Sequence, residues 1–119
     1  MKASCLLSAA LTAVGMSVLG GPMAAVAVPE IASGDGIVNA DISTCLARTD
    51  DFVTTLDVNI ERGQMDRTGY FGDGSFRILC YPNPYGQEGQ RLVVIFAAHE
   101  SDFAVADTFV QIAVAEIAD

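Results

Sequence analysis

The sequence RLVVIFAA at residues 91–98, followed by HESD at 99–102 and FAVADTFVQIAVAEIA at 103–118, decides the fold of this chain. Apolar residues fill every position from 92 to 98. Both faces of a strand here are therefore apolar, because strand side chains alternate with a period of two. Such a strand is expected to have neighbours on both edges and neither face fully open to water.

A helix is expected directly after this strand. Ser101 occupies the expected N-cap position, and Asp102 follows in the first turn, where the helix dipole favours a negative charge. On a helical wheel, the apolar residues of 103–118 cover a sector of roughly 200°. This sector is wider than packing on a sheet requires, so a second helix is expected to lie alongside.

The preceding chain supplies the rest of the fold. Asp41 is a suitable N-cap for a helix that runs to about residue 53, and strict alternation over 54–61 predicts a half-buried strand. Two short strands are predicted over 67–71 and 75–81, on either side of a tight turn at 72–74. The order α-β-β-β-β-α predicts an α+β two-layer sandwich, with a mainly antiparallel sheet and both helices on one face.

The first 27 residues have the features of a cleavable signal peptide. Lys2 gives a positive start, residues 5–19 form an apolar core, and Ala25-Val26-Ala27 matches a small-x-small cleavage site. An uncleaved membrane anchor is the alternative, but the apolar core is shorter than the roughly 20 residues that span a bilayer. We therefore expect export to a periplasm or to the outside medium.

Residues 28–40 mix Pro, Gly, Ser and Asp without a period, which predicts a flexible N-terminal arm. Residues 41–119 are then expected to form a single domain. Removing Lys2 leaves five of the six basic residues against 15 acidic ones, a formal net charge of −10. This balance disfavours nucleic acid as a partner and disfavours binding to anionic membranes after signal cleavage.

Two cysteines, Cys45 and Cys80, remain once Cys5 is removed with the signal peptide. The helical period places Cys45 on the apolar side of its helix, and the strand period places Cys80 on the same face as Phe76 and Ile78. Both sulfur atoms are thus expected to point into the core. In an oxidising compartment a disulfide is the default expectation, worth roughly 4 kcal/mol for a loop of this length.

The predicted outer face of the sheet, opposite the helices, is more apolar than a solvated surface needs to be. Side chains assigned to this face and to the adjoining loop form the candidate interaction surface: Tyr70, Leu79, Tyr81, Tyr85, Val93 and Ile95. Two explanations remain open. Loop 82–90 or the N-terminal arm folds over the face, or the face binds a partner protein or a second copy of the chain.

His99, Glu100 and Asp102 gather at the junction between the last strand and the last helix, where ligands often bind. They form a candidate ligand site, with a helix cap beside a surface histidine as the alternative interpretation. No metal site is predicted, because the chain has one histidine and its two remaining cysteines are assigned to each other.

No catalytic residues and no cofactor are predicted, since no G-x-S-x-G element is present and no second histidine is available. The sequence therefore predicts an exported, non-catalytic domain for protein–protein interaction or self-association through the outer sheet face. The alternative is an exported small-ligand or metal-binding protein that uses the site at His99, Glu100 and Asp102.

Overall fold

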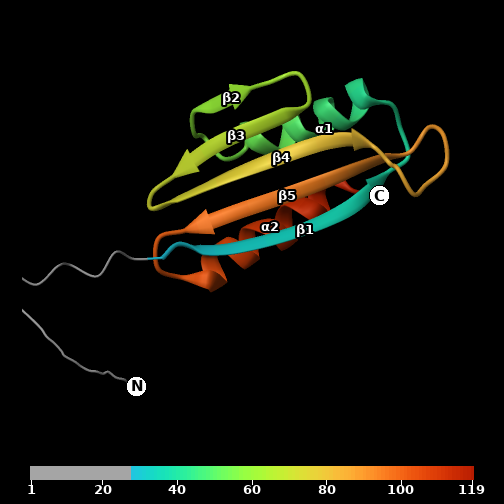
Figure 1. Ribbon diagram of the computed structural model, residues 1–119. Helices are drawn as coiled ribbons and strands as arrows, with labels where there is room; N and C mark the ends of the chain where they lie inside the picture. Colours follow the sequence, from blue (N-terminus) through green and yellow to red (C-terminus); the bar gives the residue numbers. More distant parts are fainter. Residues whose placement is uncertain (1–27) are drawn as a thin grey trace, which may run out of the picture.

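The computed structural model describes residues 28–119, which form five strands and two helices (Figure 1). In chain order the elements are β1 (Glu30–Val38), α1 (Ile42–Thr54), β2 (Ile60–Arg62), β3 (Asp66–Phe71), β4 (Gly74–Pro82), β5 (Arg91–His99) and α2 (Phe103–Ile117). The predicted signal peptide, residues 1–27, lies outside the described residues.

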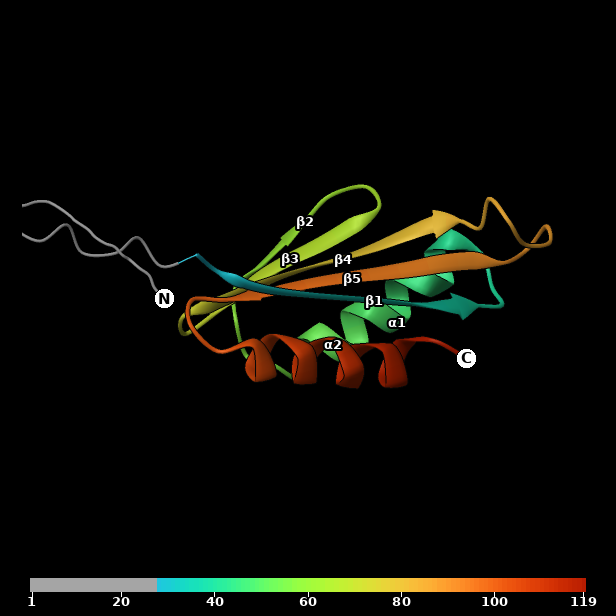
Figure 2. The same cartoon turned by 60° about the horizontal axis from the view of Figure 1, so that its bottom comes forward.

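The strands form one sheet in the order β1-β5-β4-β3-β2, and every neighbouring pair is antiparallel. Figure 2 shows both helices on one side of this sheet. The α+β two-layer architecture with an antiparallel sheet and both helices on one face is thus confirmed. The predicted strand over 91–98 has neighbours on both edges, as expected, because β5 lies between β1 and β4.

Glu30–Val38 is a strand rather than the flexible arm that the sequence predicts. It pairs with β5 along its whole length, from Glu30 opposite His99 to Val38 opposite Arg91. The glycines in this segment serve close packing. A Cβ atom on Gly34 would lie 2.7 Å from Cγ1 of Val110, and one on Gly36 would lie 2.5 Å from Cβ of Ala118. Glycine therefore lets α2 approach β1 closely.

Helix α1 begins as predicted, with the side chain of Asp41 accepting a 2.8 Å hydrogen bond from the amide of Thr44. The strand predicted over 54–61 is wrong for most of its length, because only Ile60–Arg62 is extended. The amides of Thr55 and Leu56 still donate to α1 carbonyls, and Asp57 then takes a φ of 55°. The polar–apolar alternation at 54–58 therefore spans a helix end and a turn.

Helix α2 begins one residue later than predicted. Its N-cap is Asp102, which accepts a 2.9 Å hydrogen bond from the amide of Ala104, so Ser101 is not the cap. As expected, α1 lies alongside α2: the rings of Phe52 and Phe109 are 5.8 Å apart. Phe109 also stacks on Phe71 and Phe76 of the sheet. These four rings fill the space between the two layers.

Cys45 on α1 and Cys80 on β4 are joined by a disulfide, with their Cα atoms 6.2 Å apart. Both residues are completely buried. The predicted pairing is confirmed. The bond fixes α1 to the middle of the sheet, next to the buried side chains of Ile78 and Val93 on β4 and β5.

Candidate functional site

The side of the sheet away from the helices, here called the outer face, is the candidate site. Strand register assigns to it alternate residues of the four long strands: Ile31, Ser33, Asp35 and Ile37 on β1, Leu92, Val94, Phe96 and Ala98 on β5, Ser75, Arg77, Leu79 and Tyr81 on β4, and Asp66, Thr68 and Tyr70 on β3. Among residues 28–119, no helix or loop lies over this face (Figure 2).

Neither covering segment considered from the sequence occupies this position. The predicted arm is strand β1, at the sheet edge. The loop between β4 and β5 projects beyond the end of the sheet (Figure 1), where Gln90 donates a 3.1 Å hydrogen bond to the side chain of Asn39. Within the described part of the chain, the outer face is therefore open.

Three of the six predicted interaction residues lie on the outer face, namely Tyr70, Leu79 and Tyr81. Tyr85 lies off this face, in the loop after β4, and is 96% exposed. Val93 and Ile95 were assigned to the wrong side: both are completely buried beneath the helices. Their neighbours Val94 and Phe96 occupy the outer face instead.

The reason for this reversal is the register of β5 against β4. Ile78 is opposite Ile95, so the buried face of β4 and the odd-numbered residues of β5 share one side. Since both faces of β5 are apolar, the sequence of β5 does not indicate which of its two faces is buried.

A shallow groove of about 430 Å³ runs across the outer face between β1 and β3. Its lining includes Ile31, Tyr70 and Phe96, which are 63%, 55% and 45% exposed. Arg77 crosses the groove and donates a 2.9 Å hydrogen bond from Nε to Oγ1 of Thr68. The groove thus combines aromatic and aliphatic walls with one guanidinium group held in place by a neighbouring strand.

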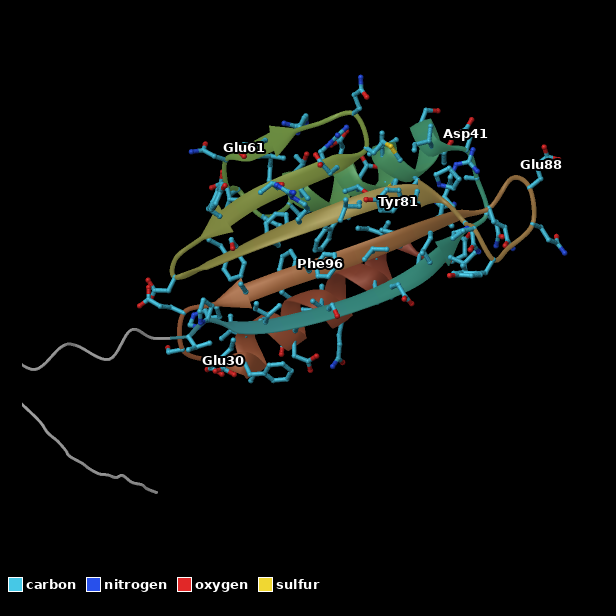
Figure 3. The ribbon with its side chains drawn as sticks, in the orientation of Figure 1. Glu30, Asp41, Glu61, Tyr81, Glu88 and Phe96 are labelled. Carbon is cyan, nitrogen blue, oxygen red and sulfur yellow. A yellow bond between two sulfur atoms is a disulfide. The ribbon has the colours of Figure 1, made fainter. Side chains whose placement is uncertain are left out.

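Charged groups are sparse on the outer face. Three of the 15 acidic residues, Asp35, Glu61 and Asp66, point to this face from the strands, together with the basic residue Arg77. Figure 3 shows Tyr81 and Phe96 over the middle of the sheet, whereas Glu30, Glu61 and Glu88 lie toward its margins. An apolar centre with aromatic residues and an arginine, surrounded by charge, is the composition of a protein interface.

The predicted ligand site at His99, Glu100 and Asp102 is occupied by hydrogen bonds within the chain. Nδ1 of His99 accepts from the amides of Ser101 and Asp102, at 3.2 and 2.9 Å. The carboxylate of Asp102 caps α2, and the amide of Glu100 donates to the carbonyl of Asp73. Within residues 28–119, no group of three His, Cys, Asp or Glu side chains is placed to hold a metal ion. The cluster therefore shapes the turn into α2.

A second charged cluster, which the sequence did not reveal, joins α1 to β3. Arg67 is 8% exposed and donates to both carboxylate oxygens of Asp50, as well as to the carbonyls of Gly63 and Asp66. The hydrogen bond from Arg67 holds the pKa of Asp50 below its ordinary value, with a smaller contribution from Arg62. These bonds use nearly all the donors of the guanidinium, so the cluster is structural.

No family model matches this chain, and no curated protein matches it. Among the residues that the structure describes, no helix is both long enough and apolar enough to cross a bilayer. The candidate site consequently rests on the geometry and composition of the outer face.

Proposed function

We propose that this protein is a small exported domain that binds a partner protein through the outer face of its sheet. The observation that carries the proposal is the open row of apolar and aromatic side chains around Arg77. Aromatic and arginine side chains supply much of the binding free energy in protein interfaces.

The size of the outer face supports this proposal. Strands β4 and β5 have nine residues each. Strands of that length span about 30 Å, and five neighbouring strands cover about 20 Å across, which gives a plane of about 600 Å². A standard interface buries about 800 Å² on each partner. The outer face therefore offers somewhat less than a standard interface, and the adjoining loop, with the 96% exposed Tyr85, would extend it.

The rigidity of the sheet also supports this role. Leu79 and Tyr81, on the outer face, flank Cys80, whose disulfide holds β4 against α1. Side chains on a fixed strand lose less conformational entropy on binding than side chains on a mobile loop. The same disulfide, together with the apolar leader in residues 1–27, supports export, because disulfides persist in oxidising compartments.

Site-specific photo-crosslinking in the native host tests the proposal. A photoreactive phenylalanine analogue replaces Phe96 on the outer face in the full chain. Ile112 on α2 is the matched control position, because it is apolar and 51% exposed but lies on the helical side. We expect one discrete adduct from position 96 and none from position 112.

The mass of the adduct identifies the class of partner. An adduct with a different protein supports a dedicated partner, and an adduct of twice the mass of the chain indicates self-association through the same face. Equal labelling from positions 96 and 112, or no adduct from position 96, would contradict the proposed role of the outer face.

A further inference from the structure

Among the residues that the structure describes, strand β1 lies at one edge of the sheet, with β5 on one side and no strand on the other. The backbone N–H and C=O groups of a strand point alternately to its two sides. The amide of Asp119 donates a 2.8 Å hydrogen bond to the carbonyl of Ile37, and Asp119 Oδ2 accepts a 2.7 Å bond from the amide of Asn39. Odd-numbered residues of β1 therefore turn their backbone groups toward the free edge.

Asp119, in the segment after α2, therefore hydrogen-bonds to the backbone at the C-terminal end of β1, as a residue of a neighbouring strand would. By the same alternation, the backbone groups of Ile31, Ser33 and Asp35 point outward beyond that end. Within residues 28–119, no backbone hydrogen bond reaches these outward groups. A row of unpaired strand donors and acceptors is a template for an added strand.

A groove of about 500 Å³ lies directly beside this open part of β1, between the strand and α2. Gly34 contributes only backbone to the groove, and the partly buried Val114, beside the buried Val110, forms its apolar wall. A strand added to β1 would turn alternate side chains toward this wall and the others toward the outer face. The helix-facing positions would therefore take small apolar side chains.

The charges around the groove select the occupant. Asp35 and Asp107 both line it, and no basic residue does. Gln111 holds the Asp107 carboxylate through a 2.8 Å hydrogen bond. A lysine or arginine at an outer-side position of the added strand would lie beside the Asp35 carboxylate, and Asp107 adds negative charge on the helix side; a second acidic copy of this chain would be repelled.

We infer that β1 between Ile31 and Asp35, together with α2, is a strand-addition site for an extended segment that carries basic side chains. The site lies at the sheet edge and is bound through backbone hydrogen bonds, whereas the outer face is bound through side chains; Asp35 borders both. Main-chain bonds would supply affinity, and Asp35 and Asp107 would supply the preference for basic segments.

Fluorescence anisotropy with a labelled peptide of alternating valine and lysine tests the inference on the full, oxidised chain. The first comparison uses the same peptide methylated on alternate backbone nitrogens, which keeps its charge and loses its donors. The second uses a peptide with glutamate in place of lysine. We expect saturable binding of the lysine peptide only, with affinity at least about tenfold higher than for either control peptide.

Matched variants of Ser33 test the position of the site. Ser33→Pro removes an outward N–H without touching the ladder to β5, and proline is tolerated at such edge positions. Ser33→Ala changes the side chain and keeps the N–H. We expect Ser33→Pro to weaken binding about tenfold and Ser33→Ala to leave it unchanged. Asp35→Asn should weaken binding of the lysine peptide and reduce its dependence on salt.

Equal binding of the methylated and unmethylated peptides by the unmodified chain would overturn the inference, since charge alone would then explain the association. Absence of saturable binding to the lysine peptide would overturn it as well. Both results concern the edge of β1, so neither bears on crosslinking from position 96.

Discussion

The carboxylate of Asp50 on α1 forms a two-point ion pair with the side chain of Arg67 on β3. It accepts hydrogen bonds from Nε at 2.6 Å and from Nη2 at 3.2 Å. The guanidinium is nearly buried, whereas Asp50 lies closer to the surface. This pair connects the helical layer to the half of the sheet that lies away from α2.

Replacing Asp50 should therefore destabilise the fold. Asp50→Ala leaves the buried guanidinium of Arg67 without its anion, and we expect a loss of about 1–3 kcal/mol in the free energy of unfolding. The exposed neighbour Asp51 provides the control, since Asp51→Ala removes the same group from the same helix turn. Urea denaturation measures both variants, and equal midpoints would show that the ion pair contributes little.

Stability should fall in acid because three carboxyl groups have a lowered pKa in the folded chain. The causes are the Arg67 hydrogen bond for Asp50, the Thr44 amide for Asp41 and the Asn39 amide for Asp119. A lowered folded-state pKa means that the unfolded chain binds protons first as the pH falls. The stabilisation is therefore complete well above the ordinary carboxyl value of 3.8 and is lost as the pH drops through the lowered values.

Denaturant midpoints measured between neutral pH and about pH 2 should be flat at first and then decline below about pH 4. Asp50→Asn should show a shallower decline, because its side chain no longer titrates. A midpoint that rises as the pH falls would contradict the assignment of these carboxylates as stabilising anions.

The disulfide should account for a large part of the stability. Replacing Cys45 and Cys80 together by alanine releases a crosslink between residues 35 positions apart in the sequence. We expect a loss of about 2–5 kcal/mol, typical of removing a native disulfide from a small domain. Thermal unfolding of the double variant, compared with the oxidised and the reduced parent chain, checks this value. An unchanged melting temperature in both comparisons would show that the bond is energetically minor.

The substitution Gly36→Ala tests whether residues 30–38 form a packed strand or a flexible arm, because the two alternatives predict opposite changes in the free energy of unfolding. In a flexible arm, the substitution would leave stability unchanged or raise it by up to about 1 kcal/mol, because alanine restricts the unfolded chain. Against α2 the new Cβ would meet Ala118, and we expect a loss of about 1–3 kcal/mol from overpacking. Chemical denaturation gives the sign. Ser33→Ala, on the same strand but facing away from α2, is the control.

Paired aspartate substitutions on β5 test which face is buried. Ile95→Asp puts a charge into a completely buried position and should cost about 3 kcal/mol or more. Phe96→Asp, at a position 45% exposed, should leave the folded state populated and act on partner binding instead. Circular dichroism melts of the two variants measure the difference, and the reverse order of stability would restore the orientation that the sequence predicted.

Local patterns were sufficient for several elements of this fold. The cap at Asp41, the period of α1 and the alternation over 75–81 each lie within one element. Together they predicted that Cys45 and Cys80 both point into the core, where the disulfide lies. The outer-face positions of Leu79 and Tyr81 followed from the same alternation, and that of Tyr70 from the short strand predicted over 67–71.

For α1 and β4 the sequence by itself thus determined which side is buried, because the two sides of these elements differ in polarity. The alternation at 54–58 did not make a strand, since it spans a helix end and a turn. Tertiary structure decided the rest. Strand β5 is apolar on both faces, so its pairing with β4 and the position of the helices chose Val93 and Ile95 as core. In the sequence alone, the glycines of β1 indicate a flexible segment. The tertiary structure shows that they make room for Val110 and Ala118 on the α2 side.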